Sequence, residues 1–414
     1  MKILFVASRI GNHRAGGHIL SAASLAKALL NLGHQVHFAI NSRNLPDYLR
    51  SSGVQCLYVS VANVRWSIMR LVMGYWSRSL PLLSLARKEK YDLIVAMDSL
   101  AAWHASVPAC LLNIPMLPVV AGGSNVEGAF PHSLTVVFSA ENRESLLRLG
   151  WDPESVVVSE GRIDFTEFLP KDRNVEVSKP VFLRLLYLSR LDRSKRPAFE
   201  GFVRELENLS NVDVGVQEII VDIAGDGPDR EKWVQHLAQA SIAPNIRVQF
   251  LGYRHVTGHF FRQYDLVVTM GRGILEALAS GVPAAIAGPE GYKGLVREEN
   301  FARFAPSNFT GRGTVGLGNL AHDLKTLLSV DRLEHLSGRN LRSYVIERYS
   351  SESGAETLLH CLNVMGERLI PAGGRFLRLM KWHVRSVFRR SLKAFKGRLR
   401  PLGRDDNWPM KLRS

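Results

Sequence analysis

Two basic side chains stand five positions apart shortly after an apolar run, and both could bind an anion. Residues 183–188 are mostly apolar, and the polar segment after them contains Arg190 and Lys195. An arginine fork and a lysine ammonium at the end of a strand can together hold a diphosphate. The alternative interpretation is that both are solvated loop cations without a ligand. The neighbouring motifs must decide between a diphosphate site and this alternative.

Glycine-containing turns follow the next two apolar runs. Residues 225–228 spell Gly-Asp-Gly-Pro, in which the glycines permit a tight turn and the proline suits the first position of a helix. Gly225 could therefore contribute to a ligand site or to the turn alone. After residues 246–250, Gly252 and Tyr253 bring backbone groups to a strand end, where they could contact the flat edge of a base.

A third loop combines glycines, a cation and an acid. The apolar run 266–269 is connected by Gly271, Arg272 and Gly273 to a helical pattern that contains Glu276. Backbone amides at a helix N-terminus favour phosphate, and Arg272 adds a full positive charge. We expect Glu276, in the first turn of that helix, to accept hydrogen bonds from sugar hydroxyls.

The N-terminal part of the chain supplies candidates for the opposite side of the same site. Gly16 and Gly17 precede a helical pattern that begins near His18, and such a helix start suits a phosphate or an acceptor. Asp98 follows the apolar run 93–96 and is a further polar candidate. A flexible surface turn is the alternative for the glycine pair.

Along the sequence, short apolar runs that read as strands alternate with helical patterns, and the candidate residues lie at the ends of these runs. In the first half, we predict strands at residues 2–8, 35–40, 55–59, 93–96, 116–120 and 134–138. In the second half, we predict strands at residues 183–188, 218–224, 246–250, 266–269 and 283–287. This alternation predicts an α/β fold with two Rossmann-like, doubly wound parallel-sheet domains. Ligands in such sheets bind beyond the carboxyl ends of the strands, which places the site in a cleft between the domains.

Breaks in the pattern give the expected boundaries. We expect a first domain at residues 1–165 and a second at residues 178–350. A helix at residues 351–370 could pack back on the first domain, and residues 371–414 form a basic tail.

The order and spacing of these motifs resemble GT-B-fold retaining glycosyltransferases, especially the large family 4 group. The resemblance rests on residues 190–195, 225–228, 250–252 and 275–283, and it covers about residues 1–365. It implies that Arg190 and Lys195 bind the donor diphosphate and that Glu276 holds the ribose. It further implies an acceptor-binding first domain and a second domain that binds a nucleotide-diphosphate sugar.

The resemblance also implies transfer with retention of configuration and with neither a metal nor a cofactor. Positive charge at the leaving diphosphate would take the place of a divalent cation. The chain departs from the family pattern at Val268, where the first glutamate of a glutamate pair is expected. The short segment of residues 271–273 also replaces a longer family segment that touches the donor sugar.

Composition excludes several classes of protein. The 414 residues are 46% hydrophobic and 22% charged, which is sufficient for two cores and excludes a disordered or collagen-like chain. Three widely spaced cysteines argue for a reducing compartment and against a structural zinc site. We find neither a secretory signal nor an unbroken apolar run of about 20 residues, so we expect a soluble or membrane-surface protein.

Most of the net charge of +15 lies at the C-terminal end. Residues 375–414 contain 13 of the 53 Lys and Arg residues but only two of the 38 acidic residues. Within this tail, residues 376–399 form an amphipathic helical pattern with a cationic face, which is typical of adsorption to anionic lipid. The alternatives for this helix are docking on the fold and nucleic-acid binding. We expect membrane contact, and therefore no nucleic-acid partner.

These observations together predict a glycosyltransferase at the inner, cytoplasmic face of the membrane. Its expected partners are a nucleotide-diphosphate sugar, a glycan or lipid-linked acceptor, and an anionic membrane surface that contacts residues 375–400. Two alternatives stay open: a sugar-nucleotide 2-epimerase of the same architecture, and a catalytically silent binding module.

Overall fold

The structure is a computed structural model that describes residues 1–7, 17–40, 49–50, 52–59, 68–122, 134–170, 181–314, 318–329 and 339–367. All structural statements below concern these residues. Gly16 and the predicted tail at residues 371–414 lie outside them, as do residues 171–180 near the expected domain boundary.

The first domain is built on a seven-stranded parallel sheet with the strand order β3-β2-β1-β4-β5-β6-β7. Its strands are β1 (Lys2–Val6), β2 (Gln35–Ile40), β3 (Gln55–Tyr58), β4 (Leu93–Ala96), β5 (Met116–Val120), β6 (Thr135–Val137) and β7 (Val156–Val158). Helices cover both faces, so β1 and β4 are almost wholly buried and appear in the sequence as unbroken apolar runs. Strand β7 was not predicted, because a run of three valines is too short to be recognised as a strand.

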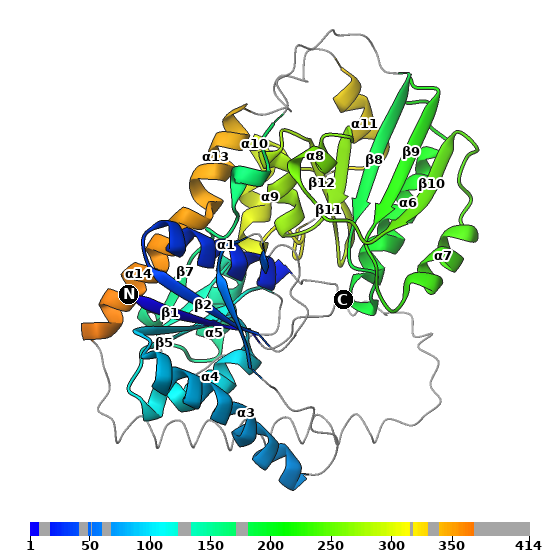
Figure 1. The fold of residues 1–414 in the computed structure, drawn as a ribbon. Helices are drawn as coiled ribbons and strands as arrows, with labels where there is room; N and C mark the ends of the chain where they lie inside the picture. The colour runs from blue at the N-terminus through cyan, green and yellow to red at the C-terminus, as the bar shows by residue number, and fades with distance from the viewer. Residues whose placement is uncertain are drawn as a thin grey trace.

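The helices of this domain lie on opposite faces of the sheet. They are α1 (Gly17–Asn31), α3 (Ile68–Glu89), α4 (Ser99–Leu111) and α5 (Ala140–Arg148), with short 3-10 turns at Pro153–Ser155 and Phe165–Glu167. The apolar side of α1 packs on one face of the central strands, while α3 and α4 pack on the other (Figure 1).

The second domain repeats this design with the strand order β10-β9-β8-β11-β12-β13. Its strands are β8 (Phe182–Leu188), β9 (Glu218–Ala224), β10 (Ile246–Gly252), β11 (Leu266–Thr269), β12 (Ala284–Gly288) and β13 (Gly291–Leu295). Its helical elements are η3 (Arg193–Lys195), α6 (Arg196–Leu209), α7 (Arg230–Ala238), α8 (Gly258–Phe261), α9 (Arg272–Ala279), α10 (Glu298–Phe304), η4 (Ala305–Ser307), α11 (Leu320–Leu328) and α13 (Arg339–Tyr349). The prediction of two doubly wound domains is therefore confirmed, and β13, which pairs antiparallel with β12, is an unpredicted addition.

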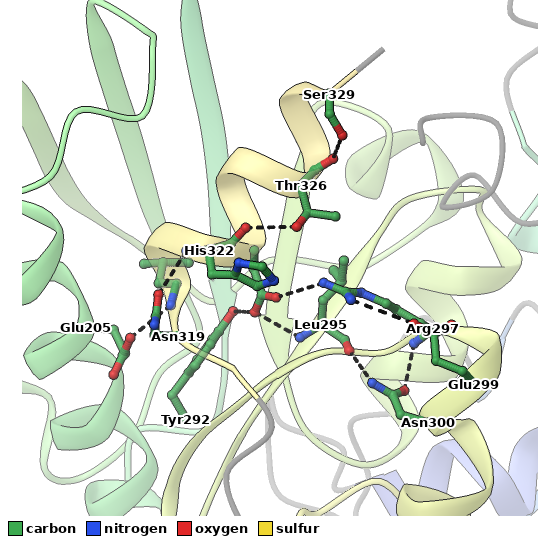
Figure 2. Close-up of polar contacts among 12 residues, drawn as sticks. Glu205, Tyr292, Leu295, Arg297, Glu299, Asn300, Asn319, His322, Thr326 and Ser329 are labelled. Atoms are coloured by element: carbon green, nitrogen blue, oxygen red, sulfur yellow. Dashed lines mark hydrogen bonds and ion pairs between the residues drawn. The ribbon is translucent and has the colours of Figure 1, made fainter. Parts of the chain in front are cut away.

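A buried carboxylate attaches β13 to helix α11. The Asp323 carboxylate accepts hydrogen bonds from Tyr292 Oη at 2.8 Å, the Leu295 N–H at 3.0 Å and Arg297 Nη2 at 3.3 Å (Figure 2). Burial raises the pKa of Asp323, while these donors act in the opposite direction. The network stabilises the edge of the sheet, away from the residues that line the interdomain cavity described below.

The chain crosses between the domains twice, and the two crossings touch. At the crossings, Ile163 forms a parallel bridge with Ser350, and a Cβ added to Gly354 would lie 2.0 Å from Gly161 O. After the second crossing, helix α14 (Ser351–Glu367) packs on α1, and Ala355, Leu358 and Cys361 join the core of the first domain. The first domain is therefore made of two separate stretches of sequence.

Candidate active site

A cavity of about 700 Å³ lies between the two domains. Its walls come from the start of α1 and the loops after β4 and β5 in the first domain, and from the loops after β8, β9, β10 and β11 in the second. In the second sheet, these loops include those after β8 and β11, the neighbouring strands between which the strand order reverses; in the first sheet, the loop after β4 lies at the corresponding point. Such points are the usual ligand sites of doubly wound sheets.

The first-domain wall contains Gly17, His18 and Asp98. Burial lowers the pKa of His18, and Arg190 across the cavity lowers it further, while Asp98 acts in the opposite direction. Asp98 also has a structural role: its Oδ1 caps helix α4 by accepting hydrogen bonds from the N–H groups of Leu100 at 3.0 Å and Ala101 at 2.9 Å. The cavity thus places the Asp98 carboxylate near an imidazole whose pKa lies below its ordinary value.

Arg190 and Lys195 both line the second-domain wall. The loop that carries them is held by Asp192, whose Oδ1 accepts the Ser194 N–H at 2.9 Å and whose side chain also pairs with Arg190. Lys195 Nζ lies 3.2 Å from Met270 Sδ, and burial lowers the pKa of this ammonium, with Arg190 adding to the shift. Arg190 is exposed toward solvent, whereas Lys195 is partly buried.

Two glycines bring the loops after β8 and β9 into backbone contact. A Cβ on Gly225 would lie 1.8 Å from Ser189 O, and one on Gly227 would lie 2.0 Å from Leu191 O. The Gly225 N–H also donates to Gly252 O at 2.8 Å, which connects the loop after β10. Gly225 and Tyr253 line the cavity, whereas Gly252 does not, so Gly252 acts on the loop rather than on the cavity wall.

The third predicted loop is arranged differently from a free phosphate-binding turn. Helix α9 begins at Arg272, so Glu276 lies beyond the first turn in which we expected it. Gly271, Arg272, Gly273 and Glu276 all line the cavity, but the Gly271 N–H donates to Phe309 O at 2.8 Å. Arg272 Nε donates to Glu276 Oε1 at 2.5 Å, and its Nη1 donates to Arg162 O at 2.8 Å. Contact of Arg272 with a diphosphate stays a prediction.

Glu276 is a buried carboxylate with one cationic partner on its own helix. Only 6% of the residue is exposed, and burial raises its pKa, while Arg272 acts most strongly in the opposite direction. Glu276 lines the cavity, and its contact with a ribose stays a prediction.

Arg162, which was not predicted, is 2% exposed and lines the cavity at the crossing between the domains. Its Nη1 donates to Glu160 O at 2.6 Å, its Nη2 donates to Asn308 Oδ1, and its guanidinium lies 5.1 Å from the centroid of the Phe138 ring. Burial lowers its pKa to about 10. A single arginine in an irregular segment has no spacing that could have revealed this position.

Charge is distributed unevenly over the cavity wall. The second domain contributes five cations and two acids, namely Arg190, Lys195, Arg254, Arg272, Arg312, Asp226 and Glu276. This wall can bind an anion with two or more negative charges. In the described part of the chain, no cluster of three His, Cys, Asp or Glu side chains could hold a metal ion, and no helix is long and apolar enough to cross a bilayer.

Comparison with protein families matches each domain separately. The glycosyltransferase family 4 model matches residues 15–121, and the glycosyl transferases group 1 model matches residues 183–308. No curated protein matches the chain.

Solved structures share the fold at low sequence identity. Anabaena HepE, solved with UDP and glucose, is 15% identical with a TM-score of 0.63, over 88% of this chain and 99% of HepE. Sucrose-phosphate synthase from Thermosynechococcus elongatus has the same identity and TM-score, over 89% of this chain and 100% of the synthase. A Listeria monocytogenes protein described as a UDP-N-acetylglucosamine 2-epimerase is 15% identical with a TM-score of 0.52, over 89% and 97% of the two chains.

The family matches fall on the two sheets whose strand ends form the cavity, and together they span more than half of the chain. The chain therefore belongs to the GT-B glycosyltransferases, with a family 4 first domain and a group 1 second domain.

Proposed function

We propose that this glycosyltransferase transfers a sugar from a nucleoside-diphosphate sugar to a glycan or lipid-linked acceptor, with retention of configuration and without a metal. The observation that carries the proposal is the second-domain wall of the cavity, where the cations Arg190 and Lys195 share one surface with the buried carboxylate of Glu276. A nucleoside diphosphate presents the matching groups, a charged diphosphate and a ribose with two hydroxyls.

Each of these residues has a separate role in the proposed reaction. The C–O bond between the anomeric carbon of the sugar and the diphosphate breaks, and negative charge develops on the leaving phosphate. An acceptor hydroxyl oxygen forms the new bond to the same carbon, and the proton of that hydroxyl passes to the leaving phosphate. Arg190 and Lys195 stabilise that charge from fixed positions, which is the part that a divalent cation would otherwise take. Tyr253 and the adjoining backbone contact the base, Glu276 orients the ribose, and the acceptor enters beside Gly17, His18 and Asp98.

The resemblance to family 4 enzymes supports retention, and the structure of HepE with UDP and glucose supports a nucleotide-sugar donor. The charge of residues 375–400 supports work at the inner face of the membrane, where anionic lipid would hold the enzyme near a lipid-linked acceptor. No cofactor enters the proposal, because the nucleotide sugar is itself the substrate.

The experiment is a thermal-shift screen of the full chain against UDP, GDP, ADP, dTDP and their sugars, in buffer with EDTA. A nucleotide diphosphate that binds the folded state raises the melting temperature. NMR of the product formed with the preferred donor then gives the anomeric configuration. Stabilisation by one nucleoside diphosphate and a retained anomer are expected; no stabilisation by any of them, or an inverted anomer, overturns the corresponding part of the proposal.

The two alternatives give different products. A 2-epimerase, an alternative supported by the fold likeness to the Listeria protein, would invert the configuration at C2 of the donor sugar and would need no acceptor. A silent module would bind the nucleotide but would not hydrolyse the donor even slowly. This alternative stays open because the fully buried Val268 stands where the family has its first glutamate. Incubation of the donor with and without acceptor separates all three.

A further inference from the structure

The guanidinium of Arg272 contacts three parts of the molecule at once. On its own helix, Nε donates to Glu276 Oε1 at 2.5 Å. At the crossing between the domains, Nη1 donates to Arg162 O at 2.8 Å. On helix α1 of the first domain, Nη1 lies 3.2 Å from Ser21 Oγ, and Nη2 lies 3.4 Å from Ser24 Oγ. Only 13% of the side chain is exposed.

The two serines are oriented to accept from Arg272. Ser21 Oγ donates its own hydrogen to Gly17 O at 2.9 Å, and Ser24 Oγ donates to Leu20 O at 3.0 Å, each one turn back along α1. With their hydrogens committed to the helix, both hydroxyls offer lone pairs to the guanidinium. Serines three positions apart lie on the same face of a helix, so one planar fork can reach both.

The Arg162 carbonyl lies where the chain passes between the domains. Beside it, the N–H groups of Arg162 and Ile163 both donate to Tyr349 O, at 2.9 and 3.0 Å, and the Ser351 N–H donates to Ile163 O at 2.8 Å. The side chain of Arg272 therefore bonds this crossing, helix α9 and helix α1 together, and it links the two domains where the chain passes between them.

We propose that Arg272 is a positioning residue that holds the start of α1, with Gly17 and His18, in register with the donor groups on the second domain. The inference rests on the proposed function, because it assumes that an acceptor at α1 must meet a sugar held near Lys195 and Glu276. Rates of group transfer depend steeply on such alignment, and a displacement of about 1 Å can cost roughly a hundredfold.

The test removes the two hydroxyls and leaves Arg272, Glu276 and Lys195 in place. Alanine is the better helix former, so Ser21→Ala/Ser24→Ala keeps α1 intact. We expect kcat to fall at least about tenfold, while the Kd for the preferred nucleoside diphosphate stays within about twofold. Ser106→Ala controls for the loss of a buried helix hydroxyl: Ser106 Oγ also donates to a carbonyl of its own helix, α4, but Ser106 does not line the cavity, whereas Ser21 and Ser24 do. It should keep wild-type kcat.

A second measurement does not depend on activity. Small-angle X-ray scattering of the full chain should show a larger radius of gyration for the double variant than for wild type or Ser106→Ala, because the variant loses two of the contacts that hold α1 against the second domain. Wild-type kcat in the double variant overturns the proposal, as does a nucleotide Kd that weakens in step with kcat. If the wild type binds no nucleotide, the proposed function has failed. The scattering measurement still tests the positioning role in that case, and an unchanged scattering curve for the double variant overturns it.

Discussion

At the scale of single residues, burial separates two cations that look equivalent in the sequence. Arg190 is exposed and is paired with Asp192, whereas Lys195 is partly buried beside Met270. A charge that is already removed from water loses less hydration when an anion arrives, and its attraction to that anion is less screened. Lys195 is therefore expected to contribute more than Arg190 to diphosphate binding and to stabilisation of the leaving group.

Replacement of Lys195 by alanine should lower kcat by about a hundredfold or more, the usual effect of losing one preorganised donor of positive charge. Initial-rate measurement at saturating donor checks this. The control is Arg196→Ala, which removes the adjacent cation, one that pairs with Glu200 at 2.6 Å and does not line the cavity. Turnover like wild type in Lys195→Ala would contradict the role given to this ammonium.

The lowered pKa of Lys195 predicts a pH effect. As pH rises, a lysine whose pKa lies below its ordinary 10.5 loses its proton earlier, so activity should decline on the alkaline side before an ordinary lysine would titrate. In Lys195→Arg the charge persists at these pH values, and the decline should move to higher pH. A pH profile of kcat/KM for the two proteins measures the shift, and identical alkaline limbs would refute it.

The sequence predicted several of the side chains that line the cavity, but it did not predict the contacts that those side chains make. Lys195, Glu276 and Tyr253 do line it. The partners of Arg272 were beyond prediction, because Ser21 and Ser24 are some 250 positions away and carry no pattern of their own. Arg162 was missed for the same reason.

At the scale of elements, the site depends on three loops that support one another. Backbone hydrogen bonds connect Leu191 to Asp226 and Gly225 to Gly252, so the loops after β8, β9 and β10 form one surface. The predicted tight turn at residues 225–228 could be read from its glycines, but the close approach that demands them appears only in three dimensions. Likewise, β13 escaped prediction because Gly291 and Gly294 weaken its strand pattern.

Gly225→Ala should destabilise the protein by about 3 kcal/mol or more and impair turnover, because the new Cβ would force Ser189, and the Arg190 loop with it, away from the cavity. Chemical denaturation and initial rates provide the two measurements. Gly215→Ala is a matched control: Gly215 has a φ of +83° but no atom within 4 Å of the added Cβ, so only a backbone cost of about 1 kcal/mol is expected. Equal losses in the two variants would contradict the role of the close contact.

At the scale of the whole molecule, the predicted two-domain α/β architecture is confirmed, and the family matches assign one domain to each half. Several cross-domain contacts hold these halves together, among them Arg312 with Glu141 at 2.5 and 2.6 Å. Hydrophobic periodicity gives the sheets but contains no information about such pairs, so the angle between the domains could not be predicted.

Deletion of residues 375–414 should release the protein from anionic liposomes while leaving nucleotide binding unchanged. The deleted segment holds most of the net charge of +15, and each basic residue near an anionic surface contributes about 1 kcal/mol. Co-sedimentation with phosphatidylserine vesicles measures the first effect, with neutral vesicles as the control, and titration with nucleotide measures the second. Undiminished sedimentation of the shortened chain would exclude this tail as the membrane contact.

The return of α14 to the first domain has a consequence for biosynthesis. Ala355, Leu358 and Cys361 fill a core whose other members lie before residue 139, so a ribosome must translate the entire second domain before the first can be completed. Until then, the part of α1 that packs on α14 lacks its cover and remains open to solvent or to a chaperone. This half of the enzyme is translated first, yet its core can close only after the second domain has left the ribosome.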